Sequence, residues 1–181
     1  IRNRTINCRR RRLYQRTHLM GAVGFQEADY IWKDGKYVGW HDANIHLLST
    51  AVQFGTSVFE GIRAYETAKG PAIFRLDAHI DRLMDSAKVY RMLPEYSAEQ
   101  LRDVCVDIIR KNALRNCYIR PMVLRGYGTP GLNPILSPLE TYVAAWGWGT
   151  YLGEEALTKG VDVCVSSWQR MARNTFPARA K

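Results

Sequence analysis

The sequence predicts an α+β fold: a small N-terminal domain with a mainly antiparallel sheet flanked by helices, followed by the first strand of a second domain. Three observations lead to this prediction. Strand-like runs with short turns dominate 29–76 and 117–149, and helical periodicity fills the stretch between them. One more strand-like run, "VDVCVSSW" (161–168), stands apart and indicates the start of a further unit.

The first strands are expected to form hairpins. In "DYIWKDGKYVGW" (29–40), two short strand-like runs flank Asp34-Gly35, a dipeptide typical of two-residue hairpin turns. The stretch "FGTSVFEGIRAYET" (54–67) favours a strand because β-branched and aromatic residues are frequent in it. The following "KGPAIFRL" (69–76) is typical of a turn and a return strand.

Two helices are expected next, after a short helical turn that begins at Ser49. Asp77 is a candidate N-cap for a helix over 78–91. The apolar face of that helix would consist of Ile80, Leu83, Met84 and Ala87. Ser97 and Gln100 have the spacing of a capping box that opens a second helix. Its apolar face would consist of Leu101, Val104, Cys105, Ile108 and Ile109.

The last strands of the domain are expected in "CYIRPMVLRGY" (117–127) and "TYVAAWGWG" (141–149). The loop between them contains "GYGTPG" (126–131), which matches the glycine pattern of dinucleotide-binding sites. Such a site needs a helix after its glycines, and Pro130 and the prolines beyond it are incompatible with one. We therefore expect an ordered loop instead.

The domain organisation follows from these patterns and from charge. We expect a basic leader outside the fold (1–24), a small α+β domain (25–150), an interdomain linker (151–159) and the start of a large domain (160–181). The leader carries seven arginines, so the rest of the chain holds only +2 of the net charge of +9. Two other readings of the leader are a nucleic-acid-binding arm and a transit peptide, although the latter is normally rich in serine.

The cysteines do not indicate a metal site or a disulfide framework, because no C-x-x-C pair occurs. Three of the four lie in apolar segments and are expected to be buried and reduced. They are Cys105, Cys117 and Cys164. Since no apolar run reaches the length of a membrane span or a signal peptide, we expect a soluble, cytoplasmic protein.

Three charged residues are candidates for a binding site. His79 and Arg82 are three residues apart and share a helix face, which is either a solvated surface or part of a site. Arg120 lies inside an apolar strand, where alternation places Tyr118 and Met122 on the same side. A buried guanidinium needs an anionic partner. That partner is either a carboxylate of the protein or a carboxylate ligand, which the guanidinium fork fits well.

A family resemblance extends over about residues 28–181. It is carried, in this order, by "SVFEGIRAY", "HIDRL", "DSAKVYR", "YIRPMVLRGYG", "AAWGWGTYLG" and "VSSWQRMARNTFPARAK". Together these motifs resemble the branched-chain amino acid aminotransferases, which are class IV, fold type IV pyridoxal-phosphate enzymes. "HIDRL" is shared with D-amino acid aminotransferases and aminodeoxychorismate lyases, whereas the full combination is more specific to the branched-chain group.

The resemblance implies a cofactor, pyridoxal 5'-phosphate, and a reaction. Leucine, isoleucine or valine would be transaminated with 2-oxoglutarate to give 2-oxo acids and L-glutamate. Lys181 matches the lysine that forms the Schiff base with the cofactor, and Arg82 matches the residue that binds its phosphate. Because the family continues well beyond this lysine, we expect the chain to be an incomplete and inactive portion of an enzyme. Family members are homodimers or larger homo-oligomers.

The resemblance also implies substrate-binding residues. Tyr118 and Arg120 would face the substrate, with Arg120 pairing with the glutamate carboxylate or lying aside when the side chain is apolar. The pocket walls would be Phe59, Trp148 and the backbone at Gly61. Phe54, where many relatives have tyrosine, would act as a wall only. The loop around Tyr127 resembles one that reaches into the site of the neighbouring subunit.

Two alternatives to this function stay open at the level of sequence. One is a D-amino acid aminotransferase or an aminodeoxychorismate lyase relative. The other is a basic protein that binds nucleic acid through its arginine-rich leader, with a strong dependence on salt. With the aminotransferase hypothesis we expect small-molecule substrates as partners, and neither nucleic acid nor a membrane.

Overall fold

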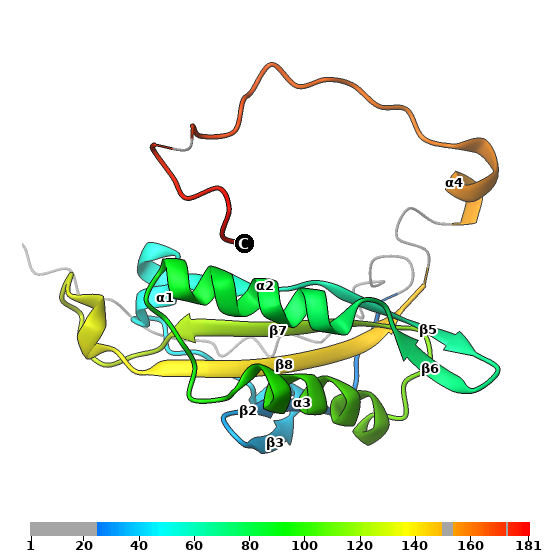
Figure 1. The fold of residues 1–181 in the computed structure, drawn as a ribbon, viewed down its shortest axis with the longest axis horizontal. Coiled ribbons are helices and arrows are strands. Elements are labelled where there is room, and N and C mark those ends of the chain that lie inside the picture. The colour runs from blue at the N-terminus through cyan, green and yellow to red at the C-terminus, as the bar shows by residue number, and fades with distance from the viewer. Residues whose placement is uncertain (1–24, 150–153, 173) are drawn as a thin grey trace, which may run out of the picture.

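The computed structural model describes residues 25–149, 154–172 and 174–181; the expected leader lies outside this range. Within these residues, eight strands form one antiparallel sheet (Figure 1). The strands are β1 (Phe25–Gln26), β2 (Tyr30–Lys33), β3 (Lys36–Gly39), β4 (Ser57–Phe59), β5 (Ile62–Thr67), β6 (Gly70–Ile73), β7 (Cys117–Arg125) and β8 (Leu139–Trp148). The helices are α1 (Thr50–Phe54), α2 (Leu76–Val89), α3 (Ala98–Lys111) and α4 (Glu154–Lys159), with 3₁₀ turns at Trp40–Asp42 and Pro134–Leu136.

The strand order is β3-β2-β8-β7-β5-β6, with β1 paired to β8 and β4 paired to β7. The long strands β7 and β8 form the centre, and the loop containing "GYGTPG" connects them without an α-helix, as expected. The β2–β3 hairpin turns at Asp34 and Gly35, whose φ angles of 43° and 85° are those that such a turn requires. The α+β prediction is therefore confirmed for this domain.

Helix starts were predicted with mixed success. Ser49 caps α1, and Ser97 with Gln100 forms the predicted capping box of α3. Asp77, however, is not the N-cap of α2. That helix begins two residues earlier than predicted, at Leu76, after Arg75 in a left-handed conformation, so Asp77 lies in the first turn. An acid there still interacts favourably with the helix dipole.

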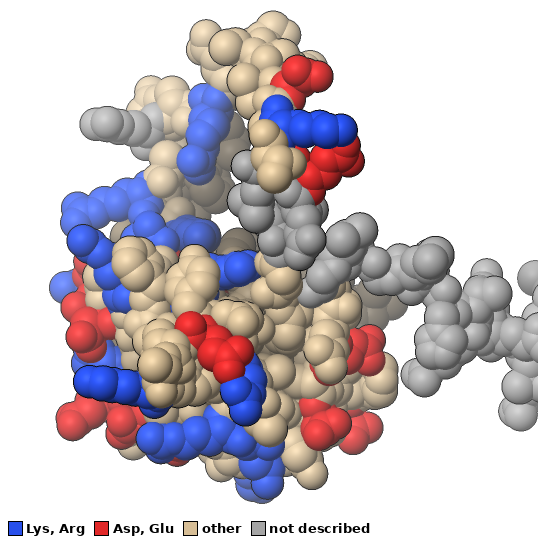
Figure 2. Space-filling view, turned by 90° about the vertical axis from the view of Figure 1, so that its right-hand side faces the viewer, with Lys and Arg blue, Asp and Glu red and all other residues tan. Residues whose placement is uncertain are grey.

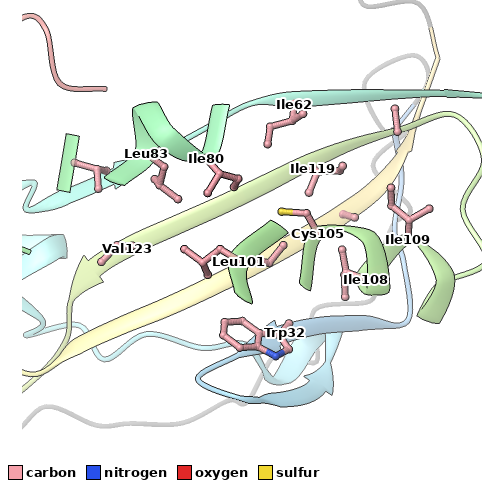
Figure 3. Close-up of a cluster of buried hydrophobic side chains, with 14 of the residues drawn as sticks. Trp32, Ile62, Ile80, Leu83, Leu101, Cys105, Ile108, Ile109, Ile119 and Val123 are labelled. Atoms are coloured by element: carbon pink, nitrogen blue, oxygen red, sulfur yellow. The ribbon is translucent and has the colours of Figure 1, made fainter. Parts of the chain in front are cut away.

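The core lies between one face of the sheet and the helices α2 and α3. In Figure 3, Ile80 and Leu83 of α2 and Leu101 and Ile108 of α3 point towards the strands. Strand residues of the same cluster include Ile62, Ile119 and Val123. Cys105 and Cys117 are also buried here, as predicted, and burial raises the pKa of their thiols to about 12 and about 11.

The predicted strand over 161–168 is absent from the described part of the chain. These residues have no hydrogen-bonded partner strand, and their side chains are exposed, with Val165 at 100% and Trp168 at 91%. A strand is stable only when another strand completes its hydrogen-bond ladder. Cys164 is exposed for the same reason, so the expectation that it is buried was wrong. Beyond this segment the chain returns to α2, where its C-terminal end lies (Figure 1).

One face of the folded body is mixed in charge (Figure 2). On the face in Figure 2, basic and acidic side chains are interspersed rather than gathered into a field of one sign. Among the described helices, none has the length and apolar character that a membrane crossing requires.

Candidate active site

The candidate site lies at the junction between strands β4 and β5. The sequence predicted one strand here, but the ladder is interrupted at Glu60 and Gly61. The pairing register with β7 nevertheless continues, from Phe59 opposite Met122 to Ile62 opposite Ile119. The cause is Pro121 on β7, which has no N–H to donate to the ladder. Its carbonyl still accepts a hydrogen bond from the Glu60 N–H at 2.9 Å.

Strand alternation places Glu60 on the face of the sheet that the helices cover, and its side chain is completely buried. Two residues of α2 meet its carboxylate. Arg82 donates from Nε to Oε1 at 2.5 Å and from Nη2 to Oε2 at 2.6 Å. His79 Nδ1 lies 2.9 Å from Oε2. Burial by itself raises the pKa of Glu60, but the hydrogen bonds from Arg82 and His79 outweigh it and bring the pKa below its usual value.

Lys181 lies beside the same carboxylate. Its backbone is fixed twice: its N–H donates to Ser86 Oγ at 3.0 Å, and its carbonyl accepts from the Phe59 N–H at 2.9 Å. Its Nζ is 3.9 Å from Glu60 Oε2 and 5.4 Å from the centre of the Phe59 ring. The chain end therefore lines the free edge of β4, with its amine next to the buried charge cluster.

Arg120 occupies the opposite face of the sheet, inside a box of aromatic rings. Its guanidinium carbon lies 4.5 Å from the ring centre of Phe59, 5.3 Å from that of Tyr118 and 5.7 Å from that of Trp146. Its Nη2 donates to the Tyr118 hydroxyl at 3.3 Å, while its Nε is buried without an acceptor among the described residues. No carboxylate of the described residues pairs with Arg120.

Gly61 gives Tyr118 its place in this box. A Cβ at position 61 would lie 1.8 Å from the Tyr118 hydroxyl oxygen and 2.7 Å from its Cζ. The Tyr118 ring in turn packs at a tilt of 44° against Trp148, with 5.0 Å between ring centres. Glycine is thus needed here for close approach, and through Tyr118 it fixes the surroundings of Arg120.

The substitution Gly61→Ala is expected to destabilise the protein by about 1–3 kcal/mol, the usual cost of overpacking. Tyr118 would have to leave its position, and the hydrogen bond to Arg120 would be lost. Urea unfolding of the two proteins measures the difference. Gly131→Ala is the matched control, because the nearest atom to a Cβ there is Thr129 Oγ1 at an ordinary 3.5 Å. Equal stability of the two alanine variants would show that Tyr118 can move at no cost.

The sequence-predicted residues divide into two groups. The structure brings together Lys181, Arg82, Phe59, Gly61, Tyr118, Arg120 and Trp148. Phe54, at the end of α1, is half exposed and has no ring contact within the described residues. Tyr127 is also exposed and stacks on His46, with 4.1 Å between ring centres.

Three residues of the site were not predicted: Glu60, Ser86 and Trp146. A signal for Glu60 was present, because it alternates with Val58 and Ile62 and so falls on the core face of the strand. An acid at a core position requires a cationic partner. Ser86 lies on the same helix as Arg82, but only the return of a distant segment gives it a partner.

The arrangement combines two chemical environments at the edge of β4. On one face, a buried carboxylate gathers an arginine, a histidine and a primary amine. Arg82 also lines a cavity of about 210 Å³ with Asp85, Ser86, Val89 and Arg179. On the other face, an arginine with an unused donor is enclosed by aromatic rings. The first environment can hold an anionic group next to a nucleophilic amine, and the second can accept either a carboxylate or an apolar side chain.

Comparisons with known proteins agree with this chemistry. The model of the "Amino-transferase class IV" family matches residues 57–181. A branched-chain-amino-acid aminotransferase of Salmonella typhimurium is 50% identical over 157 residues, which are 86% of this chain and 51% of that protein. The corresponding Pseudomonas aeruginosa enzyme is 46% identical over 153 residues, covering 83% of this chain and 49% of its own length.

Solved structures give the same result. The branched-chain amino acid aminotransferase of Escherichia coli superposes with a TM-score of 0.82 at 49% identity, covering 86% of this chain and 51% of its own. A second branched-chain amino acid aminotransferase, from the organism abbreviated T.th. and complexed with N-(5'-phosphopyridoxyl)-L-glutamate, superposes with a TM-score of 0.78 at 45% identity, covering 86% and 50%. The chain spans about half the length of the relatives that it matches.

Proposed function

Since the chain belongs to the amino-transferase class IV family, we propose that it is part of a branched-chain amino acid aminotransferase. The reaction would transfer the amino group of leucine, isoleucine or valine to 2-oxoglutarate. The names of the relatives support the choice of substrate. The observation that carries the proposal is the aromatic box around Arg120.

A transaminase of this kind must accept leucine and glutamate in one pocket. Phe59, Tyr118 and Trp146 offer apolar surface to a branched side chain. Arg120 offers a guanidinium whose Nε lacks an acceptor in the described chain, and this group would bind the γ-carboxylate of glutamate or 2-oxoglutarate. The two substrates would thus use different parts of the same box.

The residues on the helix-covered face fit pyridoxal 5'-phosphate. The aldehyde and phosphate arms of this cofactor stand on neighbouring ring carbons. Arg82 Nη2 and Lys181 Nζ approach the same oxygen, Glu60 Oε2, at 2.6 and 3.9 Å, so a guanidinium is available for the phosphate arm and an amine for the aldehyde arm. Half of the Arg82 side chain is exposed and can meet a phosphate. When bound, the cofactor supplies an electron-withdrawing ring that stabilises negative charge at the substrate Cα.

The chain's own residues would perform the remaining tasks. Arg82 would bind the phosphate, and Lys181 would hold the cofactor covalently through Nζ. After substrate has displaced it, the Lys181 amine would move the proton at the substrate Cα, for which it must be uncharged. Arg120 and the aromatic rings would orient the substrate side chain and exclude water. Residues 160–181 would belong to a large second domain, and 151–159 would be the linker to it.

Assembly is part of the proposal. Large apolar side chains close in sequence to Tyr127 and to its stacking partner His46 are exposed, including Leu47 (74%), Leu132 (85%) and Ile135 (70%). Exposed apolar side chains that form a patch are typical of an interaction surface. We assign it to a second copy of the protein, so that the enzyme is a homodimer or a larger homo-oligomer.

The test is a transamination assay of the full-length protein with pyridoxal phosphate, L-leucine and 2-oxoglutarate. We expect L-glutamate to form with L-leucine and not with D-alanine as the amino donor. Glutamate formation from neither donor would overturn the proposal. Turnover of D-alanine alone would favour the D-amino acid aminotransferase alternative.

A further inference from the structure

Glu60 is an unusual residue for its position. It is completely buried on the face of the sheet where its neighbours in the alternation are apolar. Burying a carboxylate is costly unless charged partners and hydrogen bonds compensate for it. Three such partners are present, and they come from two separate parts of the chain: His79 and Arg82 from α2, and Lys181.

The contact with Arg82 is made along one edge of the guanidinium. Nε and Nη2 each donate a hydrogen bond to a different oxygen of Glu60, at 2.5 and 2.6 Å. A guanidinium has further donors, on Nη1 and on the outer side of Nη2. These make no hydrogen bond within the described residues, and 50% of the side chain is exposed. Glu60 therefore holds the group in a fixed plane and leaves its outer donors free.

The location of this free edge is also set by the fold. Arg82 shares its cavity with Arg179, on the segment that leads to Lys181, although Asp85 lines the cavity too. The Lys181 amine approaches the same Glu60 oxygen that Arg82 Nη2 binds. An anion bound to the outer edge of Arg82 would thus lie beside the amine.

Resting on the proposed function, we propose that Glu60 is a positioning residue for the cofactor phosphate. Its carboxylate binds one edge of Arg82 so that the other edge faces the phosphate, next to Lys181. Glu60 does not touch the cofactor and acts through Arg82. A purely structural ion pair between β4 and α2 would be different, because its loss would weaken every ligand of the site alike.

The experiment compares two ligands that differ only in the phosphate, pyridoxal 5'-phosphate and pyridoxal. Their dissociation constants are measured by absorbance titration of the full-length protein. For Glu60→Gln, which keeps the shape and removes the charge, we expect binding of pyridoxal phosphate to weaken about tenfold or more, and binding of pyridoxal to change far less. In an Arg82→Gln background, Glu60→Gln is expected to have almost no further effect on either ligand.

Two more variants complete the design. Glu66→Gln is the matched control, because Glu66 follows on the adjoining strand β5 and pairs with Arg115 at the surface. It should leave both dissociation constants unchanged. Glu60→Asp keeps the charge and shortens its reach, so the preference for the phosphate should lie between wild type and Glu60→Gln. If Glu60→Gln does not fold, the Glu60→Asp variant tests the inference, through the ratio of its dissociation constants for pyridoxal and pyridoxal phosphate.

Two results would overturn the inference. One is an equal loss for both ligands, and the other is an undiminished effect of Glu60→Gln in the Arg82→Gln background. Failure of the proposed function is recognised separately, because the wild-type protein would then show no transamination of leucine. If the wild type transaminates leucine but does not prefer pyridoxal phosphate to pyridoxal, only the inference about Glu60 falls.

Discussion

Replacing Lys181 by alanine is expected to lower the rate of leucine transamination by the full-length protein about 10²- to 10⁴-fold, the contribution of a positioned proton-transferring side chain. The same substitution should abolish covalent attachment of pyridoxal phosphate. Both effects have one cause, because the amine at Nζ is the group that would bind the cofactor and move the proton.

The structure indicates that Lys181→Ala removes the amine without disturbing the fold. Lys181 is held by its backbone, through Ser86 Oγ and the Phe59 N–H, and alanine can make both hydrogen bonds. The side chain is 40% exposed, so truncation leaves no closed cavity. The fold should therefore persist, and the lost rate should report on the amine.

Attachment is measured by borohydride reduction followed by mass spectrometry of the peptides. We expect the wild-type peptide that contains Lys181 to carry the cofactor. Lys159→Ala is the control, since Lys159 pairs with Glu155 on the surface of α4 and should affect neither rate nor labelling. A cofactor found on another lysine, or a Lys181→Ala enzyme with the wild-type rate, would show that Lys181 is not the catalytic lysine.

The parts of the fold that depend on local interactions were predictable from sequence. The turn at Asp34-Gly35 depends on two adjacent residues, and the capping box of α3 depends on Ser97 and Gln100 alone. Long strands such as β7 and β8 are rich in β-branched and aromatic residues, which favour strands. In each case the physical cause lies within a few residues of the structure that it produces.

The features that were missed depend on distant residues. The interruption at Glu60 and Gly61 comes from Pro121, which lies on the partner strand and is distant from Glu60 in the sequence. The run over 161–168 has a strand-like pattern, but a strand also needs a partner, and no described strand lies against this run. The residue pattern of a segment predicts which secondary structure the segment prefers, but it does not predict which strand the segment pairs with.

The candidate site shows the same division. Arg82, Arg120 and Lys181 were identified through the family motifs, and Arg120 also through the cost of burying a guanidinium in an apolar strand. Glu60 lies between Arg82 and Lys181 and contacts both, but it was not predicted as a site residue. Its neighbours in "FEGIRAY", Phe59 and Gly61, were assigned as pocket walls instead. The alternation rule applied to Glu60 itself would have placed it in the core and required a cationic partner.

The substitution Arg120→Met is expected to separate the two substrates of the enzyme. Loss of the guanidinium leaves the γ-carboxylate of glutamate unpaired in an aromatic box, and removing one partner of a buried charge pair costs about 2–5 kcal/mol. At the low end this is about a 30-fold loss of kcat/KM for glutamate and 2-oxoglutarate. Leucine should lose much less, because methionine continues the apolar surface of Phe59, Tyr118 and Trp146.

The measurement is kcat/KM in separate half-reactions, with leucine and with glutamate as amino donor. Arg115→Met is the matched control: Arg115 precedes the same strand, but its side chain is exposed and pairs with Glu66 at the surface. The control should leave the ratio of the two constants unchanged. Equal losses of kcat/KM for both substrates in Arg120→Met would show that Arg120 supports the fold and does not bind the γ-carboxylate. The expected outcome, a changed ratio at nearly constant leucine activity, requires that the guanidinium meets only one of the two side chains.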